Sequence, residues 1–147
     1  MNTFRRILVP VDGSPTSNRA LVAALQMARD GGGSVRLVHV LEPLAYLPGV
    51  DYANRAIADA RRRAREVLVA AEAIAQSAGV PAETVLVDRP DLRLGEAVAE
   101  EARNWRADLV AVGSHGRRGI GRVLLGSGAE QIIRLAPSPV LVIRDGE

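Results

Sequence analysis

The stretch Asp108-Leu109-Val110-Ala111-Val112-Gly113-Ser114-His115-Gly116 joins an apolar run directly to a glycine-rich segment. The apolar run is typical of a buried strand. After nine further residues come Gly126-Ser127 and then Ala129–Leu135, where Ile132, Ile133 and Leu135 favour a helix. A glycine-rich loop between a strand and a helix can hold phosphates, because its backbone N–H groups and the helix dipole attract negative charge. The stretch therefore predicts an α/β fold with a nucleotide site at this loop.

The chain contains no lysine, since all 19 of its basic residues are arginine. A Walker A loop needs a lysine to reach the β- and γ-phosphates, and Schiff-base chemistry needs a lysine amine. Receiver-type phosphorylation domains also depend on a lysine. Three common kinds of small α/β domain are therefore excluded.

The composition predicts a soluble protein of one domain over residues 1–147. The chain has no cysteine, which excludes disulfides, thiolate metal sites and a cysteine nucleophile. No apolar run approaches the 18 or more residues of a membrane span, and the N-terminus lacks the apolar stretch of a signal peptide. We therefore expect a cytoplasmic protein that does not bind membranes.

The charge pattern does not favour nucleic-acid binding. The formal net charge is +2 and aromatic residues make up 3% of the chain, whereas nucleic-acid binders combine a basic face with stacking aromatics. The basic run Arg61-Arg62-Arg63 is interleaved with acids, and Asp59 is predicted to pair with Arg63 at i,i+4. We therefore predict a solvated helix face here and no nucleic-acid partner.

Strand-like and helix-like segments alternate along the whole chain. Apolar runs predict five strands, at Phe4–Val11, Val35–Leu41, Thr84–Val87, Leu109–Val112 and Pro139–Ile143. Apolar stripes at helical spacing predict four helices between them: one capped by Ser14, one over Tyr52–Ser77, one capped by Asp91 and one over Ala129–Leu135. Such alternation implies parallel βαβ units with right-handed crossovers. We therefore predict a doubly wound α/β fold whose open parallel five-stranded sheet has the Rossmann-like or flavodoxin-like order 3-2-1-4-5.

Two candidate site residues follow strands that this order makes neighbours. Asp12 follows the first strand and Gly113 follows the fourth. Ligands of open α/β sheets bind beyond the carboxyl ends of the strands, where the strand order reverses. Asp12 is therefore a candidate for hydrogen bonding to ribose hydroxyls, or for holding a metal through water. Its alternative role is that of an Asx-turn residue.

Several segments together resemble the ATP-binding type of the universal stress protein family. The spacing Gly113-x-x-Gly116, nine residues, Gly126-Ser127 is similar to the ATP signature of that family. Ile7–Ser14 resembles its first strand and turn, Val38–Val40 its second strand and Pro137–Ile143 its closing strand. The resemblance covers essentially the whole chain in matching order. It implies an ATP-binding regulator or sensor of the stress response, often a homodimer, that hydrolyses ATP slowly or not at all.

The resemblance also implies roles for single residues. The adenosine end of ATP would be lined by Pro10, Val11 and Asp12, and adenine would meet the backbone of Val40. Ribose and phosphates, with Mg²⁺ as a candidate companion ion, would be surrounded by Gly113, Gly116, Gly126 and Ser127. The strand Val140–Ile143 would pair with a second copy across a two-fold axis.

The residues after Gly126-Ser127 depart from the family pattern, which has an aliphatic and then a hydroxyl residue. Here they are Gly128 and Ala129. Ala129 cannot donate a side-chain hydrogen bond, whereas Gly128 lets a phosphate approach closely. This departure motivates an alternative function, a dimeric interaction module of the same fold that does not bind nucleotides. A third hypothesis, an adenylating enzyme, lacks its histidine or serine-glycine-glycine signature after the first strand.

Several side chains have a structural and a functional interpretation. Ser127 and Glu130 fit a capping box. If phosphates bind here, the charge of Glu130 requires that it turn away, pair with an arginine or help hold a metal. His39 fits a satisfied core histidine, and His115 could donate to a phosphate. The loop also contains Arg117, Arg118 and Arg122. These arginines could be charge partners of a triphosphate, or they could simply be solvated loop residues.

Overall fold

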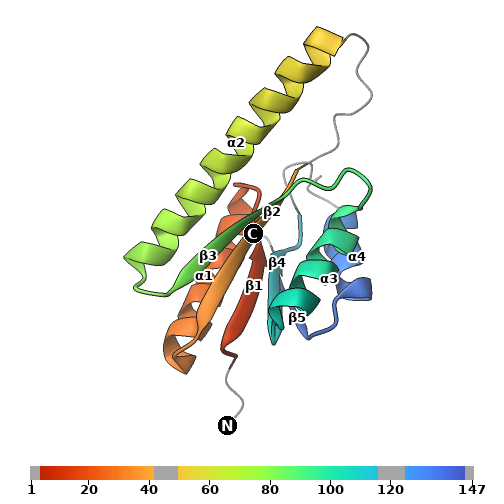
Figure 1. The fold of residues 1–147 in the computed structure, drawn as a ribbon. Helices are drawn as coiled ribbons and strands as arrows, with labels where there is room; N and C mark the ends of the chain where they lie inside the picture. Colours follow the sequence, from red (N-terminus) through yellow and green to blue (C-terminus); the bar gives the residue numbers. More distant parts are fainter. Residues whose placement is uncertain (1–3, 42–49, 116–124, 145–147) are drawn as a thin grey trace.

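The computed structural model describes residues 4–41, 50–115 and 125–144 of the chain. Five strands and four helices alternate in it: β1 (Arg6–Pro10), α1 (Pro15–Gly31), β2 (Ser34–Val40), α2 (Val50–Ser77), β3 (Ala82–Val87), α3 (Leu94–Trp105), β4 (Leu109–Gly113), α4 (Ser127–Leu135) and β5 (Val140–Ile143). The strands form one parallel sheet in the order β3-β2-β1-β4-β5 (Figure 1). The predicted fold class and strand order are confirmed.

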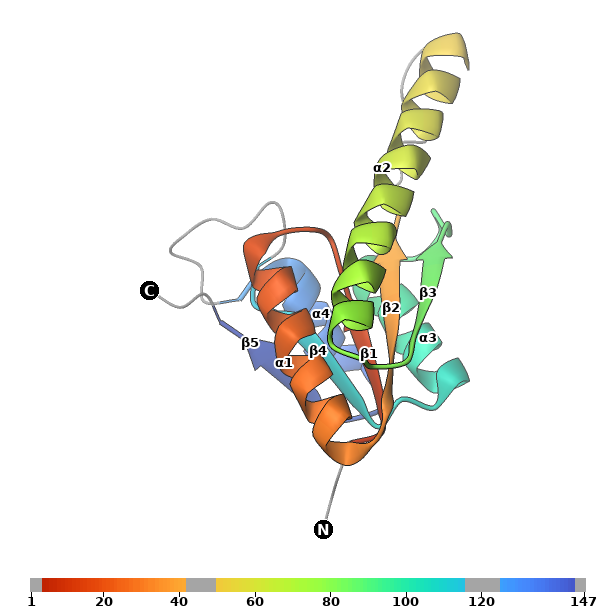
Figure 2. The same cartoon turned by 90° about the vertical axis from the view of Figure 1, so that its left-hand side faces the viewer.

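The helices cover both faces of the sheet (Figures 1 and 2). Helices α1 and α2 pack on one face, against Ile7, Val9 and Leu37, and helices α3 and α4 pack on the other, against Leu8 and Val38. Successive strand residues point to opposite faces, so both faces of β1 and β2 are buried. This explains why the strands appear in the sequence as continuous apolar runs.

Helix α2 is longer than the sheet it covers. It has 28 residues, and its N-terminal turns extend past the carboxyl ends of the strands (Figures 1 and 2). Its C-terminal half is buried on the sheet through Leu68, Ala71 and Ala75. Ile57 and Ala60, which the pattern also places on the inner face, are only half-buried because the sheet ends before these turns. The overhang forms a wall above the edge of the sheet.

Helix α1 begins as predicted, whereas α3 does not. The Ser14 hydroxyl accepts a hydrogen bond from the Ser17 N–H at 3.2 Å and caps α1. The predicted cap of α3, Asp91, is wrong, because α3 begins at Leu94 with Arg93 as its N-cap residue. The two carboxylate oxygens of Asp91 instead accept hydrogen bonds from the Arg89 guanidinium, at 3.0 and 2.9 Å. A local charge pair thus takes the place of the helix cap.

The remaining strand and helix bounds lie within two residues of the predicted ones. The structure starts β3 at Ala82 and α4 at Ser127, each two residues earlier than predicted. Among the residues that the structure describes, no helix has both the length and the apolar character needed to cross a bilayer.

Candidate functional site

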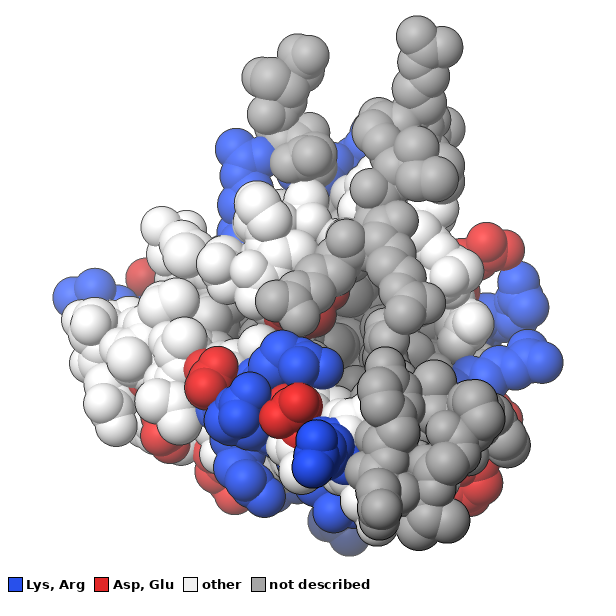
Figure 3. All heavy atoms as spheres, turned by 90° about the horizontal axis from the view of Figure 1, so that it is seen from above, with Lys and Arg blue, Asp and Glu red and all other residues white. Residues whose placement is uncertain are grey.

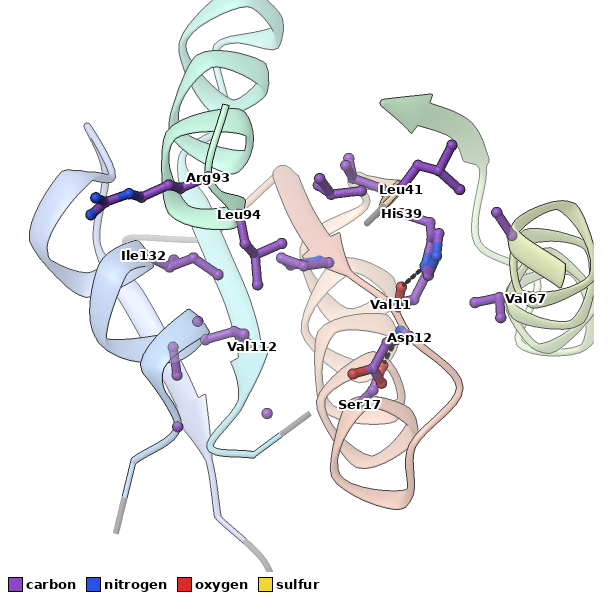
Figure 4. Close-up of a pocket in the computed structure, with 18 of the residues that line it drawn as sticks. Val11, Asp12, Ser17, His39, Leu41, Val67, Arg93, Leu94, Val112 and Ile132 are labelled. Carbon is purple, nitrogen blue, oxygen red and sulfur yellow. Dashed lines mark hydrogen bonds between the residues drawn. The ribbon is translucent and has the colours of Figure 1, made fainter. Parts of the chain in front are cut away.

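A cleft of about 900 Å³ opens at the carboxyl ends of the strands. Its floor comprises the ends of β1, β2 and β4, and its walls comprise α2, the segment 90–94 and the first turn of α4 (Figure 4). The volume is typical of small-molecule sites, which span roughly 300–1,000 Å³. Eight of the predicted site residues line it: Pro10, Val11, Asp12, Val40, Gly113, Gly126, Ser127 and Gly128.

The other residues predicted for this site lie outside the described part of the chain. They are Gly116 and the arginines Arg117, Arg118 and Arg122.

Asp91, which lines the cleft, belongs to a group of paired charges on the segment 88–91 and the helices beside it. Arg61 of α2 binds Asp88 at 2.7 Å, and Arg89 binds Asp91 at 2.9 Å and Glu100 at 3.5 Å. The hydrogen bond from Arg89 holds the pKa of the Asp91 carboxyl below its ordinary value. Figure 3, which looks onto this end of the molecule, shows basic and acidic side chains side by side. The Asp and Arg residues that line the cleft are also of both signs: Asp12, Asp91, Arg63 and Arg93.

Asp12 is held in a rigid turn just beyond β1. Its Oδ1 accepts a hydrogen bond from the Ser14 N–H at 2.9 Å, and its own N–H donates to the Ser17 hydroxyl at 3.1 Å. Gly13 completes the turn with a φ of 81°, a conformation that favours glycine. The predicted Asx turn is confirmed. The same turn holds the carboxyl group of Asp12 at the cleft (Figure 4).

Gly113 ends β4 where that strand meets the start of α1. A Cβ at this position would lie 2.8 Å from the backbone carbon of Thr16, so only glycine allows the contact. The Thr16 hydroxyl donates to the backbone oxygen of His115, which ties α1 to the residues after β4. Close packing of α1 on β4 is thus a structural reason for Gly113, in addition to its place at the cleft.

The first turn of α4 lines the cleft from Gly126 to Ala129. Gly126 is the N-cap residue, and the first N–H that bonds within the helix is that of Glu130, to the Gly126 oxygen at 3.0 Å. The N–H groups of Ser127, Gly128 and Ala129 precede that bond, as at any helix start. The predicted capping box is wrong, because Ser127 is already helical. The Glu130 carboxylate instead accepts from Arg134 at 3.0 Å, one turn further along.

The ends of β1 and β2 are tied together by a histidine. The Nδ1 atom of His39 lies 2.6 Å from the Val11 oxygen, and the Val11 N–H donates to the Val38 oxygen at 2.8 Å. His39 is hydrogen-bonded, as predicted, but it is half-buried at the cleft rather than enclosed in the core. Its neighbour Val40 packs against the core under α3 and α4.

Apolar side chains form two walls of the cleft. Val67 projects from α2 on one side, and Leu94, Val112 and Ile132 lie on the other (Figure 4). Leu94 is 39% exposed, although it begins an otherwise well-packed helix. Sequence reasoning did not assign these residues to the site. Helical periodicity marks Val67 as inward-facing, but it cannot show that α2 extends past the sheet.

Arg63 is another cleft residue that sequence reasoning did not find. The predicted Asp59–Arg63 pair is wrong, because Asp59 binds Arg62 at 3.3 Å across three residues. Arg62 also approaches Glu66, at 4.0 Å. Arg63 lies on the face of α2 that lines the cleft, together with Ala60 and Ala64.

The described residues hold no group of three or more His, Cys, Asp or Glu side chains that could bind a metal ion. A Mg²⁺ ion needs fewer protein ligands, since one or two carboxylates together with substrate phosphates are enough to hold it. Asp12 is the carboxylate at the end of β1 that lines the cleft. His115 also lines the cleft, and its Nδ1 lies 3.2 Å from the Ser114 hydroxyl oxygen.

A family model described as the Universal stress protein family matches residues 3–144. The chain belongs to the universal stress protein family. A universal stress protein of Thermus aquaticus is 35% identical over 141 residues, which cover 96% of this chain and 99% of that protein. Both termini of the match thus lie near the ends of the two chains.

Solved structures of the family share the fold. A universal stress family protein from Burkholderia pseudomallei is 32% identical, with a TM-score of 0.78 over 95% of this chain and 96% of that one. A universal stress protein from Archaeoglobus fulgidus, solved in complex with dAMP, is 26% identical, with a TM-score of 0.72 over 97% of this chain and 99% of that one.

Proposed function

We propose that this universal stress protein binds an adenine nucleotide, with ATP as the physiological ligand, in the cleft at the carboxyl ends of β1, β2 and β4. The proposal rests on one observation. Three segments that are far apart in the sequence line the same cleft: the Asp12 turn, the end of β2 at Val40 and the first turn of α4. The Archaeoglobus relative solved with dAMP supports an adenine nucleotide as the class of ligand.

The phosphates would lie at the first turn of α4. The N–H groups of Ser127, Gly128 and Ala129 come before the first helical hydrogen bond, and the helix dipole favours negative charge there. Glu130 is engaged by Arg134, which balances the charge that would otherwise oppose a phosphate. Gly113 and Gly126 line the same end of the cleft, and we assign Gly116 to the same loop from its place in the motif.

The adenosine would lie across the ends of β1 and β2. Pro10, Val11 and the Val40 backbone would contact the base, and the Asp12 carboxylate would accept hydrogen bonds from the ribose hydroxyls. A Mg²⁺ ion that accompanies ATP would be held by the phosphates and, through water, by Asp12.

We propose a regulator or sensor of stress rather than a rapid ATPase. Phosphoryl transfer needs a group that orients the attacking nucleophile and charges that stabilise the transition state. His115 lines the cleft, and its Nδ1 already faces the Ser114 hydroxyl, at 3.2 Å. Slow or absent hydrolysis would let the bound nucleotide report the state of the cell.

The test is to purify the protein without added nucleotide, quench it with acid and identify the released compounds by chromatography. Titration calorimetry with ATP, ADP, AMP and GTP then gives the affinities. We expect bound ATP, or binding of added ATP in preference to GTP. A protein that is purified empty and binds none of the four nucleotides would contradict the proposal.

A non-nucleotide interaction module is the second candidate, and one observation favours it. A Cβ at Gly128 would lie 2.5 Å from Leu94 Cδ2, so the Leu94 side chain lies over the turn where a phosphate would bind. If Leu94 blocks the site, Leu94→Ala will bind ATP and the wild-type protein will not. If both bind ATP with similar affinity, Leu94 is only a wall and the module hypothesis fails.

We further propose a homodimer that forms through β5. This strand is one edge of the described sheet, and its residues Val140–Ile143 are half-buried. The Val110 N–H donates to the Pro139 oxygen and the Ser114 N–H to the Ile143 oxygen. In a parallel ladder this spacing turns the backbone groups of Val140 and Val142 toward the open edge. A second copy of β5 could pair there.

A further inference from the structure

His39 carries a hydrogen bond that fixes which of its nitrogens holds the proton. Its Nδ1 lies 2.6 Å from the Val11 oxygen. A carbonyl oxygen can only accept, so Nδ1 must donate. In the neutral ring, Nε2 then has a lone pair and acts as an acceptor.

The accepting nitrogen of this ring is not buried. His39 lines the cleft and stands between Val11 and Val67 (Figure 4). The structure gives His39 one side-chain hydrogen bond, from Nδ1 to the Val11 oxygen. A buried Nε2 would therefore lack a partner, but among the described residues the one buried side-chain polar atom without a partner is Arg36 Nε. The Nε2 atom is therefore not buried, and it belongs to a residue that lines the cleft.

The wall that α2 contributes to the cleft carries small side chains, which leave room for a ligand. Helix α2 contributes Ala60 and Ala64 to the cleft, one turn apart, and their side chains are the smallest that carry a Cβ. Asp12, one residue beyond Val11, also lines the cleft. A nucleoside with its ribose at Asp12 would therefore have its base near His39.

We propose that His39 is a specificity-determining residue, whose Nε2 accepts a hydrogen bond from an amino group of the bound base. The inference rests on the proposed nucleotide function and extends it. With the 6-amino group of adenine, the ring gains a hydrogen bond. A base with no hydrogen-bond donor at this position leaves the acceptor without a partner, which is unfavourable in a partly desolvated site.

The test compares two ligands on two proteins. The ligands are AMP and purine riboside 5′-monophosphate, which has a hydrogen in place of the 6-amino group. His39→Asn is the informative variant, because the Asn amide reaches the position of Nδ1 and preserves the bond to Val11, but has no atom at Nε2. His39→Gln is the matched control, because its amide oxygen reaches the position of Nε2 and accepts there.

Titration calorimetry should show that the wild-type protein binds AMP about fivefold to tenfold more tightly than the deamino analogue, the worth of one hydrogen bond. His39→Asn should bind both ligands equally, and His39→Gln should recover part of the preference. An equal loss for both ligands in His39→Asn would overturn the inference while leaving the proposed function intact. Absence of binding of either ligand to the wild-type protein would contradict the proposed function itself.

A spectroscopic readout separates this role from a merely structural one. The chain has two histidines, so long-range ¹H–¹⁵N spectra of His39 can be assigned with a His115→Asn variant. We expect a protonated Nδ1 in the free protein and an upfield shift of the Nε2 resonance on addition of AMP. A protonated Nε2 in the free protein, or an Nε2 resonance that AMP leaves unchanged, would overturn the inference.

Discussion

At the scale of single residues, the cleft is lined by side chains that have structural and ligand-facing roles at once. Asp12 is the clearest case, since its Oδ1 closes an Asx turn on the Ser14 N–H while the residue lines the cleft. Loss of ligand binding after a large substitution of Asp12 would therefore not show which of the two roles was lost. Asparagine separates the two roles, because its amide oxygen also closes Asx turns.

We expect Asp12→Asn to retain the fold and to bind ATP about fivefold less tightly, since hydrogen bonds to a charged acceptor are roughly twice as strong as neutral ones. Titration calorimetry gives the affinity, and thermal denaturation gives the stability. Asp12→Ala, which loses the turn as well, should lower both. Wild-type affinity in Asp12→Asn would show that the carboxylate does not contact the ligand.

Gly113 illustrates a glycine that a phosphate-loop motif explains only in part. A Cβ at Gly113 would lie 2.8 Å from the Thr16 backbone, whereas a Cβ at Gly126 would lie 3.2 Å from the Ser114 oxygen. We expect Gly113→Ala to lower the free energy of unfolding by about 1–3 kcal/mol, as overpacking does, and Gly126→Ala to cost less. Urea denaturation measures both, and equal stabilities of the two variants would contradict the packing argument.

At the scale of elements, α2 decides the shape of the site. Its N-terminal turns extend past the sheet (Figure 2), and Ala60 lines the cleft. We expect Ala60→Leu to weaken ATP binding at least tenfold by filling the cleft, with little change in melting temperature because Ala60 is only half-buried. Ala58→Leu, on the exposed face of the same turn, is the matched control. Equal ATP affinities of the two variants would show that α2 is not a wall of the nucleotide site.

Periodicity in the sequence predicts the elements well and their ends less well. The alternation of strands and helices, together with the apolar character of the strands, predicts a doubly wound parallel sheet. The order 3-2-1-4-5 is one of the orders that such sheets adopt, and it brings both Asp12 and Gly113 to the cleft. Helix starts are decided by competition among a few polar contacts. Arg89 takes Asp91 away from α3, and Arg134 takes Glu130 away from a capping box, and neither outcome follows from local spacing alone.

The walls of the cleft could not be predicted from the sequence for a different reason. Leu94 lines the cleft because α3 packs beside α4, and Arg63 lines it because α2 extends past the sheet. Both arrangements are tertiary properties. The bond from His39 to Val11 joins residues 28 positions apart. A lone histidine in an apolar strand carries no signal that its partner is a strand-end carbonyl.

At the scale of the whole molecule, β5 is an edge strand of the described sheet, and it is the strand through which we propose that two copies pair. Val142 turns its backbone N–H toward that edge, while Leu141 turns its own toward β4, as the hydrogen bonds of Val110 and Ser114 imply. Proline has no N–H and is tolerated on an edge strand where that group faces outward. Val142→Pro should therefore remove pairing with a second copy and leave the sheet intact.

We expect the wild-type protein to sediment as a dimer of 15.6 kDa chains and Val142→Pro to sediment as a monomer with a nearly unchanged melting temperature. Leu141→Pro is the contrasting variant, because it loses a hydrogen bond to β4 and should unfold at a lower temperature. A wild-type monomer in analytical ultracentrifugation would remove the dimer proposal. A Val142→Pro variant that stays dimeric would place the interface on another surface. Because the cleft and β5 lie at different edges of the fold, ATP affinity should be the same in the dimer and in the Val142→Pro monomer.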